Sequence, residues 1–182
     1  MLTVVPHAKA VEQGGPVTKR EGQFLFGVGY GWGQREGINP LRWDVRMNMG
    51  YTAANGAYVG ALGDAYDGEM EDFETGYEAV YMLAGALEIG YDLRLAERWA
   101  LRFALLNGVG ALVVEECSLV FPQTEQTCSR EYEKRYGIGP SAAALYLWEN
   151  WLFFSELRQM TFISTSAVIS GVTVATGFGL HW

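Results

Sequence analysis

Two histidines limit the acid–base chemistry open to this chain of 182 residues. They are His7, near the start of the sequence, and His181, one residue before its end. A serine hydrolase needs a base within hydrogen-bonding reach of its nucleophile. Neither histidine is placed to activate a serine in the body of the chain, and we interpret His181 as a residue at the rim of the fold. We therefore expect no catalytic residues of this kind.

Acidic side chains gather in one segment that could bind a divalent cation. They are Asp64, Asp67, Glu69, Glu71, Asp72, Glu74 and Glu78. Their spacing is not that of an EF-hand, so we interpret the segment as a solvated loop. Two alternatives are a divalent-ion site that bridges lipid phosphates and a carboxylate-only peptidase built on Asp64 and Glu78. The sequence has no Cys/His cluster, and its one glycine-rich repeat, residues 27–31, precedes no helical pattern. We expect no metal and no cofactor.

The two cysteines, Cys117 and Cys128, lie in what we expect to be the longest loop. In an exported chain, two cysteines at such a spacing predict a disulfide. The bond would close a loop of about a dozen residues and stabilise it by roughly 3 kcal/mol. The alternative is two free thiols.

The composition is unusual for a surface that meets water. Glycine supplies 23 residues, aromatic residues 14% and charged residues 19%, and the only lysines are Lys9, Lys19 and Lys134. Water-facing surfaces normally carry many Lys and Glu, so another medium is expected to face much of this surface. The net charge of −8 argues against nucleic acid as a partner, because that partner needs a basic patch.

The main structural signal is an alternation of large apolar residues with small or polar ones. From Leu41 to Tyr51 every odd position is large and apolar, whereas the even positions include Arg42, Asp44 and Arg46. A period of two over about twelve residues is typical of a β-strand with two different faces. Eight such stretches are found, near 23–33, 41–52, 57–66, 77–93, 99–105, 136–148, 151–163 and 169–182. No apolar run is long enough for a transmembrane helix.

Side-chain volume indicates which face lies inside. An eight-stranded barrel is barely wide enough for ordinary side chains, so about forty large ones must point outward. Facing water, they would form an apolar patch far larger than monomers tolerate, so they are expected to face lipid. In the ambiguous third stretch we place Tyr58, Leu62 and Tyr66 outside. The fold class predicted is all-β: an eight-stranded antiparallel up-and-down transmembrane β-barrel. The alternative is an ordinary soluble sheet rich in aromatic residues.

The opposite face carries charges that are costly to bury unless they are paired. They are Arg42, Asp44, Arg46, Glu88, Arg102, Glu156 and Arg158. Four bases and three acids nearly cancel, so we interpret them as a network that fills a narrow lumen. A gated path for ions is the alternative. The spacing alone does not say which arginine meets which carboxylate.

Strand ends and connections indicate an orientation. An aromatic girdle at one membrane interface is predicted at Tyr51, Tyr58, Tyr91, Trp99, Trp148, Trp151 and Trp182. The connections at that end are short, and those at the other end are longer and acidic. Short turns are typical of the periplasmic side and long loops of the outside, so both termini are expected in the periplasm.

By these features the chain resembles small bacterial outer-membrane β-barrels of the OmpA/OmpX type. The last strand ends in an aromatic residue after alternating apolar residues, with Gly177, Phe178, Leu180 and Trp182 matching the family pattern. Ala175 departs from it, since a polar residue is usual there. The resemblance implies location in the outer membrane and assembly by the barrel-assembly machinery. It also implies contact with outer-membrane lipids and lipopolysaccharide.

We expect two parts in the chain: an N-terminal tail or residual signal segment, residues 1–21, and the barrel domain, residues 22–182. Ala8-Lys9-Ala10 resembles a signal-peptide cleavage site, although the apolar stretch before it is short. The function predicted is that of a non-enzymatic barrel with a filled polar lumen, acting structurally or through surface loops that contact another protein. The alternatives are a narrow channel for ions or small solutes and an enzyme that modifies lipid A.

Overall fold

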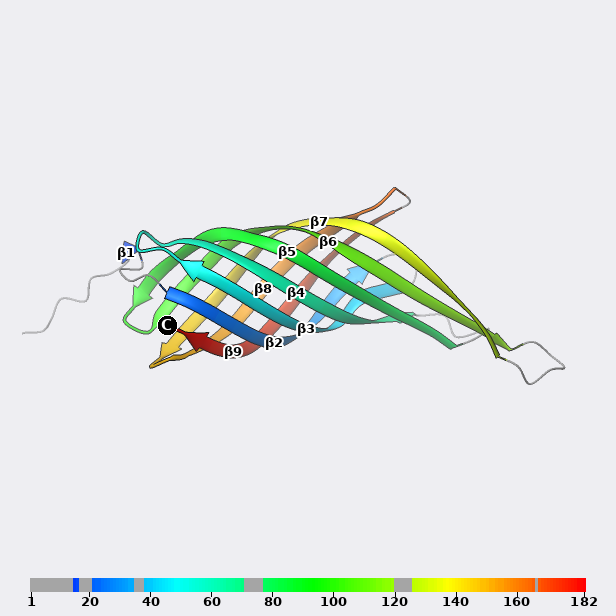
Figure 1. Ribbon diagram of the computed structural model, residues 1–182, viewed down its shortest axis with the longest axis horizontal. Coiled ribbons are helices and arrows are strands. Elements are labelled where there is room, and N and C mark those ends of the chain that lie inside the picture. Colours follow the sequence, from blue (N-terminus) through cyan, green and yellow to red (C-terminus); the bar gives the residue numbers. More distant parts are fainter. Residues whose placement is uncertain (1–14, 17–20, 35–37, 71–76, 120–125, 166) are drawn as a thin grey trace, which may run out of the picture.

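The computed structural model describes residues 15–16, 21–34, 38–70, 77–119, 126–165 and 167–182. The described residues form a single antiparallel sheet that closes on itself (Figure 1). Its strands are β1 (Gly15–Pro16), β2 (Glu21–Gln34), β3 (Ile38–Thr52), β4 (Ala57–Met70), β5 (Tyr77–Ala96), β6 (Trp99–Leu119), β7 (Gln126–Trp148), β8 (Trp151–Ile163) and β9 (Val168–His181). Within these ranges no helix is long and apolar enough to cross a membrane.

Strands β2 to β9 form the ring, each pairing with its neighbours in sequence. The ring closes where β2 pairs with β9, from Gln23 opposite His181 to Gln34 opposite Ser170. The predicted eight-stranded up-and-down barrel is therefore confirmed. The short strand β1 pairs outside the ring with Leu93 and Arg94 of β5, so part of the expected tail extends the sheet.

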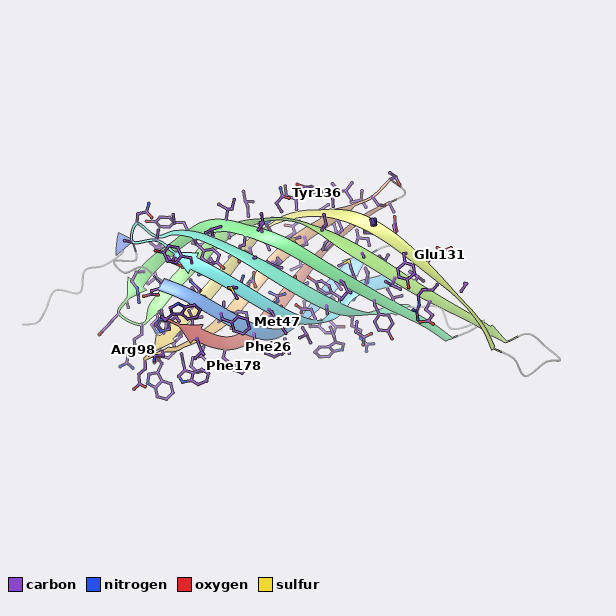
Figure 2. All side chains as sticks on the ribbon, in the orientation of Figure 1. Phe26, Met47, Arg98, Glu131, Tyr136 and Phe178 are labelled. Atoms are coloured by element: carbon purple, nitrogen blue, oxygen red, sulfur yellow. The ribbon has the colours of Figure 1, made fainter. Side chains whose placement is uncertain are left out.

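The two faces of the strands differ as the alternation predicts. Along β8 exposed and buried residues alternate for ten positions. The outward side chains are large and apolar, with Trp32 58% exposed, Leu87 60% and Val109 67%. Figure 2 shows such side chains around the whole wall, including Met47, Tyr136 and Phe178. A continuous apolar wall of this size is suited to lipid and unsuited to water.

At the start of β3 the expected faces of Leu41 and Arg42 are wrong. The β3–β4 register shifts between Asn39 and Trp43, which reverses the alternation there. Leu41 is fully buried and points into the lumen, and Arg42 is only half-buried. Asn39 supports the irregularity, because its Oδ1 accepts hydrogen bonds from the amides of Gly33 (2.9 Å) and Leu41 (3.2 Å).

The expected orientation of β4 is also wrong. Tyr58, Leu62 and Tyr66 are buried inside the barrel, whereas the small residues between them face outward. Tyr58 fits because its inward neighbours are glycines. A Cβ at Gly50 would lie 2.4 Å from the Tyr58 ring, and one at Gly60 would lie 2.2 Å from its hydroxyl. Neighbouring glycines thus make room in the lumen for the Tyr58 ring, which the size of the side chain alone would place on the outer face.

The ring is uneven in height. Strands β6 and β7 have 21 and 23 residues, against 13 and 14 for β8 and β9. As a result the β6–β7 hairpin projects far beyond the β8–β9 turn at the end of the barrel opposite the C-terminus (Figure 1). This is the end where the longer connections lie, as expected for the extracellular side.

Candidate functional site

The middle of the lumen is filled by a layer of buried charges from β3, β4 and β8. Arg158 donates to Asp64 at 2.6 Å and to Glu156 at 3.1 Å. Arg46 bridges the same layer, donating to Asp44 at 2.6 Å and to Glu156. All five side chains are at most 8% exposed. Each arginine thus meets more than one carboxylate, which is the arrangement that makes buried charges tolerable.

A second buried layer, with side chains from β2 to β6, lies nearer the end of the barrel that carries the short turns. Arg102 donates to both oxygens of Asp92, at 2.7 and 2.8 Å, and to Gln23 at 2.9 Å. Its guanidinium also stacks on Tyr58, 3.3 Å from the ring centroid. Thr52 donates to the same Asp92 at 2.7 Å. The bidentate pair and the stacked ring use the flat shape of the guanidinium, which lysine lacks.

Glu88 lies between these layers and is held by uncharged donors. Asn48 donates to Glu88 at 2.7 Å, and Tyr58 and Ser141 donate at 3.2 and 3.3 Å. The hollow that remains between the two layers is about 20 Å³. A space of that size admits about one water molecule. The polar part of the lumen is therefore packed.

The half of the lumen farther from the short turns is filled by apolar side chains. The buried cluster there comprises Leu41, Leu62, Tyr66, Val80, Met82, Leu106, Leu112, Met160, Phe162 and Ile169. Leu41 packs over Gly33 and Gly171, and Phe162 packs over Gly137, where an added Cβ would approach to within 3 Å. The filled polar lumen that we expect is therefore polar only in part, because an apolar layer covers the charged ones.

The alternation in the sequence predicts most of the charged network and misses two of its members. Six of the seven expected charges are buried in it, Arg42 being the exception. The missed members are Asp64, which we had assigned to the acidic loop, and Asp92. Asp64 is 5% exposed and bound by Arg158, so the peptidase pair with Glu78 is not supported. The alternation along β4 could have identified Asp64, because Asp64 lies on the same face of the strand as the buried Tyr66.

The remaining chemical candidates gain little from the structure. His181 lies at the rim, with Nδ1 3.9 Å from Glu21. Within the described ranges, no group of three or more His, Cys, Asp or Glu side chains is placed to hold a metal ion. Most of the acidic segment, including the side chains of residues 71–78, lies outside the described part.

The projecting β6–β7 hairpin has one open edge. The pairing of β7 with β6 continues unbroken from Tyr146 to Gln126, whereas its pairing with β8 ends at Tyr136. The amide of Leu147 donates to the carbonyl of Arg98, next to the start of β6. The backbone N–H and C=O groups of odd-numbered β7 residues therefore bond to β6, and those of even-numbered residues point to the opposite edge of β7. Between residues 126 and 134, the backbone N–H and C=O groups of the even-numbered residues therefore have no strand partner among the described residues.

The hairpin also brings the two cysteines together in register. Cys117 pairs directly with Cys128, at a position where the backbones exchange no hydrogen bond. At such positions Cα atoms lie about 4.5 Å apart, within the range that a disulfide spans. The cysteine side chains lie outside the described part, so the bond remains a prediction.

Comparison with solved structures agrees with the fold. Neisserial surface protein A matches with a TM-score of 0.64 and 10% identity, covering 88% of this chain and 96% of that one. Ail, the attachment invasion locus protein of Yersinia pestis, matches with a TM-score of 0.52 and 14% identity, over 90% and 98% of the two chains. Ail in complex with the heparin analogue sucrose octasulfate matches at 0.55 and 16%, over 90% and 99%.

At the level of sequence, no protein-family model and no curated protein matches this chain. Identities of 10 to 16% establish a shared architecture only. With its closed ring of eight strands and apolar outer wall, the chain has the fold of a small outer-membrane β-barrel.

Proposed function

We propose that the chain is a non-conducting, non-enzymatic barrel of the bacterial outer membrane that contacts other macromolecules through the β6–β7 hairpin. The observation that carries the proposal is the open edge of β7. Backbone groups at the even positions of residues 126–134 have no strand partner in the described part of the chain and can pair with an added strand. Strand addition of this kind is a common way to bind an extended polypeptide.

The base of the hairpin is anchored, which keeps the edge in place. Arg135 donates to the carbonyl of Ala167 at 3.1 Å and pairs with Glu133. Ser164, in the β8–β9 turn, donates to the same Glu133. These contacts tie β7 to the rim just below the open edge. The hairpin is therefore presented in one orientation, which lowers the entropic cost of binding.

The charge of the hairpin favours a particular class of partner. Residues 115–135 contain five acidic residues and three basic ones. This excess of negative charge is unfavourable for polysulfated ligands such as the one seen with Ail. We infer that the partner is an extended polypeptide of neutral or positive charge.

The edge can be tested by replacing Arg130 and Tyr132, whose amides face the open side, with proline. Proline removes these donors and leaves the bonds of the odd residues to β6 in place. The matched control replaces both residues with alanine, which removes the side chains and keeps the amides. Bacteria that display the chain should adhere to an epithelial monolayer. We expect the proline variant to lose that adherence and the alanine variant to keep most of it.

Equal adherence of the two variants would contradict edge pairing. Adherence of the unmodified chain no greater than that of cells lacking it would contradict the surface role itself. A separate measurement tests the closed lumen. The purified barrel in a planar lipid bilayer should give no steady current, because an apolar layer and two charged layers fill its interior. A steady open-channel current would favour the channel alternative.

A further inference from the structure

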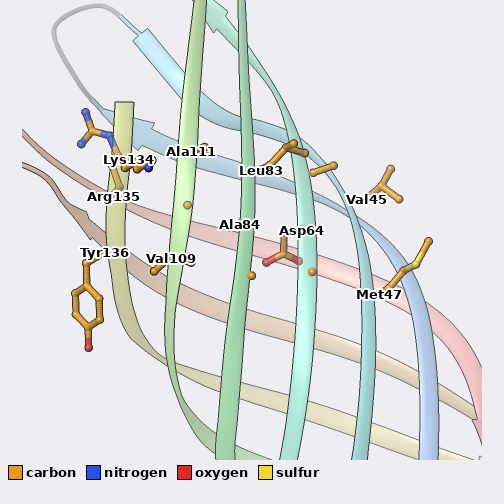
Figure 3. Close-up of a pocket in the computed structure, with 14 residues that line it drawn as sticks. Val45, Met47, Asp64, Leu83, Ala84, Val109, Ala111, Lys134, Arg135 and Tyr136 are labelled. Atoms are coloured by element: carbon orange, nitrogen blue, oxygen red, sulfur yellow. The ribbon is translucent and has the colours of Figure 1, made fainter. Parts of the chain in front are cut away.

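The lipid-facing wall carries a hollow that the surface role of the hairpin does not use. It crosses β3 to β7 and has a volume of about 930 Å³. Two rows of directly paired outward residues form it: Val45, Ala65, Leu83, Ala111 and Lys134 in one, Met47, Gly63, Gly85, Val109 and Tyr136 in the other. Figure 3 shows the labelled members spread from Val45 and Met47 on one side to Lys134 and Tyr136 on the other.

Two glycines keep the floor of the hollow open. Gly63 and Gly85 pair directly across β4 and β5. A Cβ at Gly63 would meet no atom within 4 Å, and one at Gly85 would meet only a carbonyl oxygen at 3.8 Å. At every other described glycine from residue 22 onward, a Cβ would come within 3.4 Å of a neighbouring atom. Packing within the barrel therefore explains the other glycines but not these two.

The hollow runs obliquely from the middle of the membrane to its outer surface. Met47 lies five residues from the end of β3, and Tyr136 lies twelve from the end of β7. With the usual rise and tilt of barrel strands, these positions are about 13 Å and about 30 Å above the ends that carry the short turns. The apolar band of such barrels is about 25 Å tall. One end of the hollow thus opens at the outer interface.

An exposed cation, Lys134, stands at that outer end, whereas Arg135, the other cation of the lining, is buried. Lys134 is the only lysine in residues 22–182, and its side chain is exposed. Its outward neighbours are Tyr132, Tyr136 and Ala111, and none of the described carboxylates forms an ion pair with it. An ammonium group at the interface, beside an apolar hollow, is suited to a phosphate that is attached to a hydrocarbon chain.

The geometry points to a binding site for one acyl chain of outer-leaflet lipid A, with a lipid A phosphate paired to Lys134. Five strands at the usual spacing give the hollow a length of about 19 Å. This is enough to hold a chain that crosses half of a hydrocarbon core about 30 Å thick. A second copy of the barrel fits less well, because a two-fold contact would set two concave surfaces and two ammonium groups against each other.

The test fills the hollow without disturbing the fold. Gly63→Leu together with Gly85→Leu places two side chains in the open space. The matched control is Ala61→Leu, which adds the same side chain to the same face of β4 outside the hollow. A third variant, Lys134→Gln, removes the charge alone. Heat-modifiable migration on an unboiled gel confirms that each full-length variant is folded.

Native mass spectrometry of the purified barrel with added lipid A measures retention, and phosphatidylglycerol serves as the competing anionic lipid. We expect one lipid A per barrel for the unmodified chain and the Ala61→Leu control. The double leucine variant should lose it, and Lys134→Gln should bind roughly tenfold more weakly. Unchanged retention in the double variant, or equal retention of phosphatidylglycerol, would overturn the proposal. So would a dimer of the unmodified chain that the double variant abolishes.

Discussion

Gly22 and Trp182 join the two ends of the barrel wall. The amide of Gly22 donates to the carbonyl of Trp182 at 2.9 Å, and the amide of Trp182 donates back at 3.0 Å. The indole lies against the glycine so closely that a Cβ there would be 2.6 Å from the ring. The last residue of the chain thus forms the final rung of the ring closure and also covers the first residues of β2.

Loss of the terminal indole should therefore impair assembly. We expect Trp182→Ala to lower the yield of folded barrel several-fold, because it removes the packing of the indole on Gly22 where the ring closes. The folded fraction can be read from unboiled gels of outer-membrane preparations. Trp151→Ala is the control, since Trp151 is another outward-facing indole, paired with Leu180 two residues before Trp182. Equal yields from both variants would contradict a special role for the last residue.

The charged layer should be sensitive to the loss of a single arginine. Arg158→Met removes one of the two arginines that Asp64 and Glu156 share and leaves Arg46 as their only cation in a buried setting. Breaking such a network typically costs about 3 to 5 kcal/mol of unfolding free energy. Urea unfolding in detergent, followed by tryptophan fluorescence, measures the loss. Adding Asp64→Asn to Arg158→Met should restore part of the stability, and a further loss instead would show that the carboxylate does not depend on this arginine.

The apolar layer should respond to crowding at one glycine. A Cβ at Gly137 would lie 2.8 Å from the ring of Phe162, so Gly137→Ala is expected to destabilise the barrel by about 1 to 3 kcal/mol. Phe162→Leu should relieve part of that cost when the two changes are combined. The coupling energy from a double-mutant cycle measures the relief. Purely additive effects would mean that the two residues do not compete for the same space.

The cysteine pair can be tested at the tip of the hairpin. We expect alkylation under non-reducing conditions to leave Cys117 and Cys128 unmodified, and alkylation after reduction to modify both. Reduction should speed proteolysis within residues 118–127, because an open tip samples more conformations. The barrel itself should resist in both states. Full alkylation without a reductant would show two free thiols.

The alternation in the sequence was sufficient to predict the barrel, because lipid and lumen impose opposite demands on successive residues. The alternation gives a wrong prediction where a neighbouring residue determines whether a side chain points into the lumen or toward lipid. Leu41 lies inside because of a bulge near Asn39, and a local shift of register leaves no periodic signal. Tyr58 lies inside because glycines on its own and the adjacent strand make room for the ring. The first error arose from extending the alternation across a shift of register, and the second from judging a side chain by its own size.

The sequence predicts most of the residues that belong to the charged network, but it does not predict which arginine pairs with which carboxylate. The contact between Arg46 and Glu156 joins residues 110 apart in sequence and depends on the way the ring closes. Asp64 was missed for the same reason as Tyr58, because both share the inward face of β4. The open edge of β7 depends on the unequal lengths of β7 and β8, which the alternation did not reveal.

The unequal strand lengths also determine what a large molecule meets when it approaches the cell. From Tyr136 to Gln126 the hairpin rises ten residues, or roughly 25 Å once strand tilt is included. The β8–β9 turn stays near the foot of that rise. An antibody raised against the folded hairpin should therefore bind intact cells, whereas one against the β8–β9 turn should require that the surface sugars be stripped away.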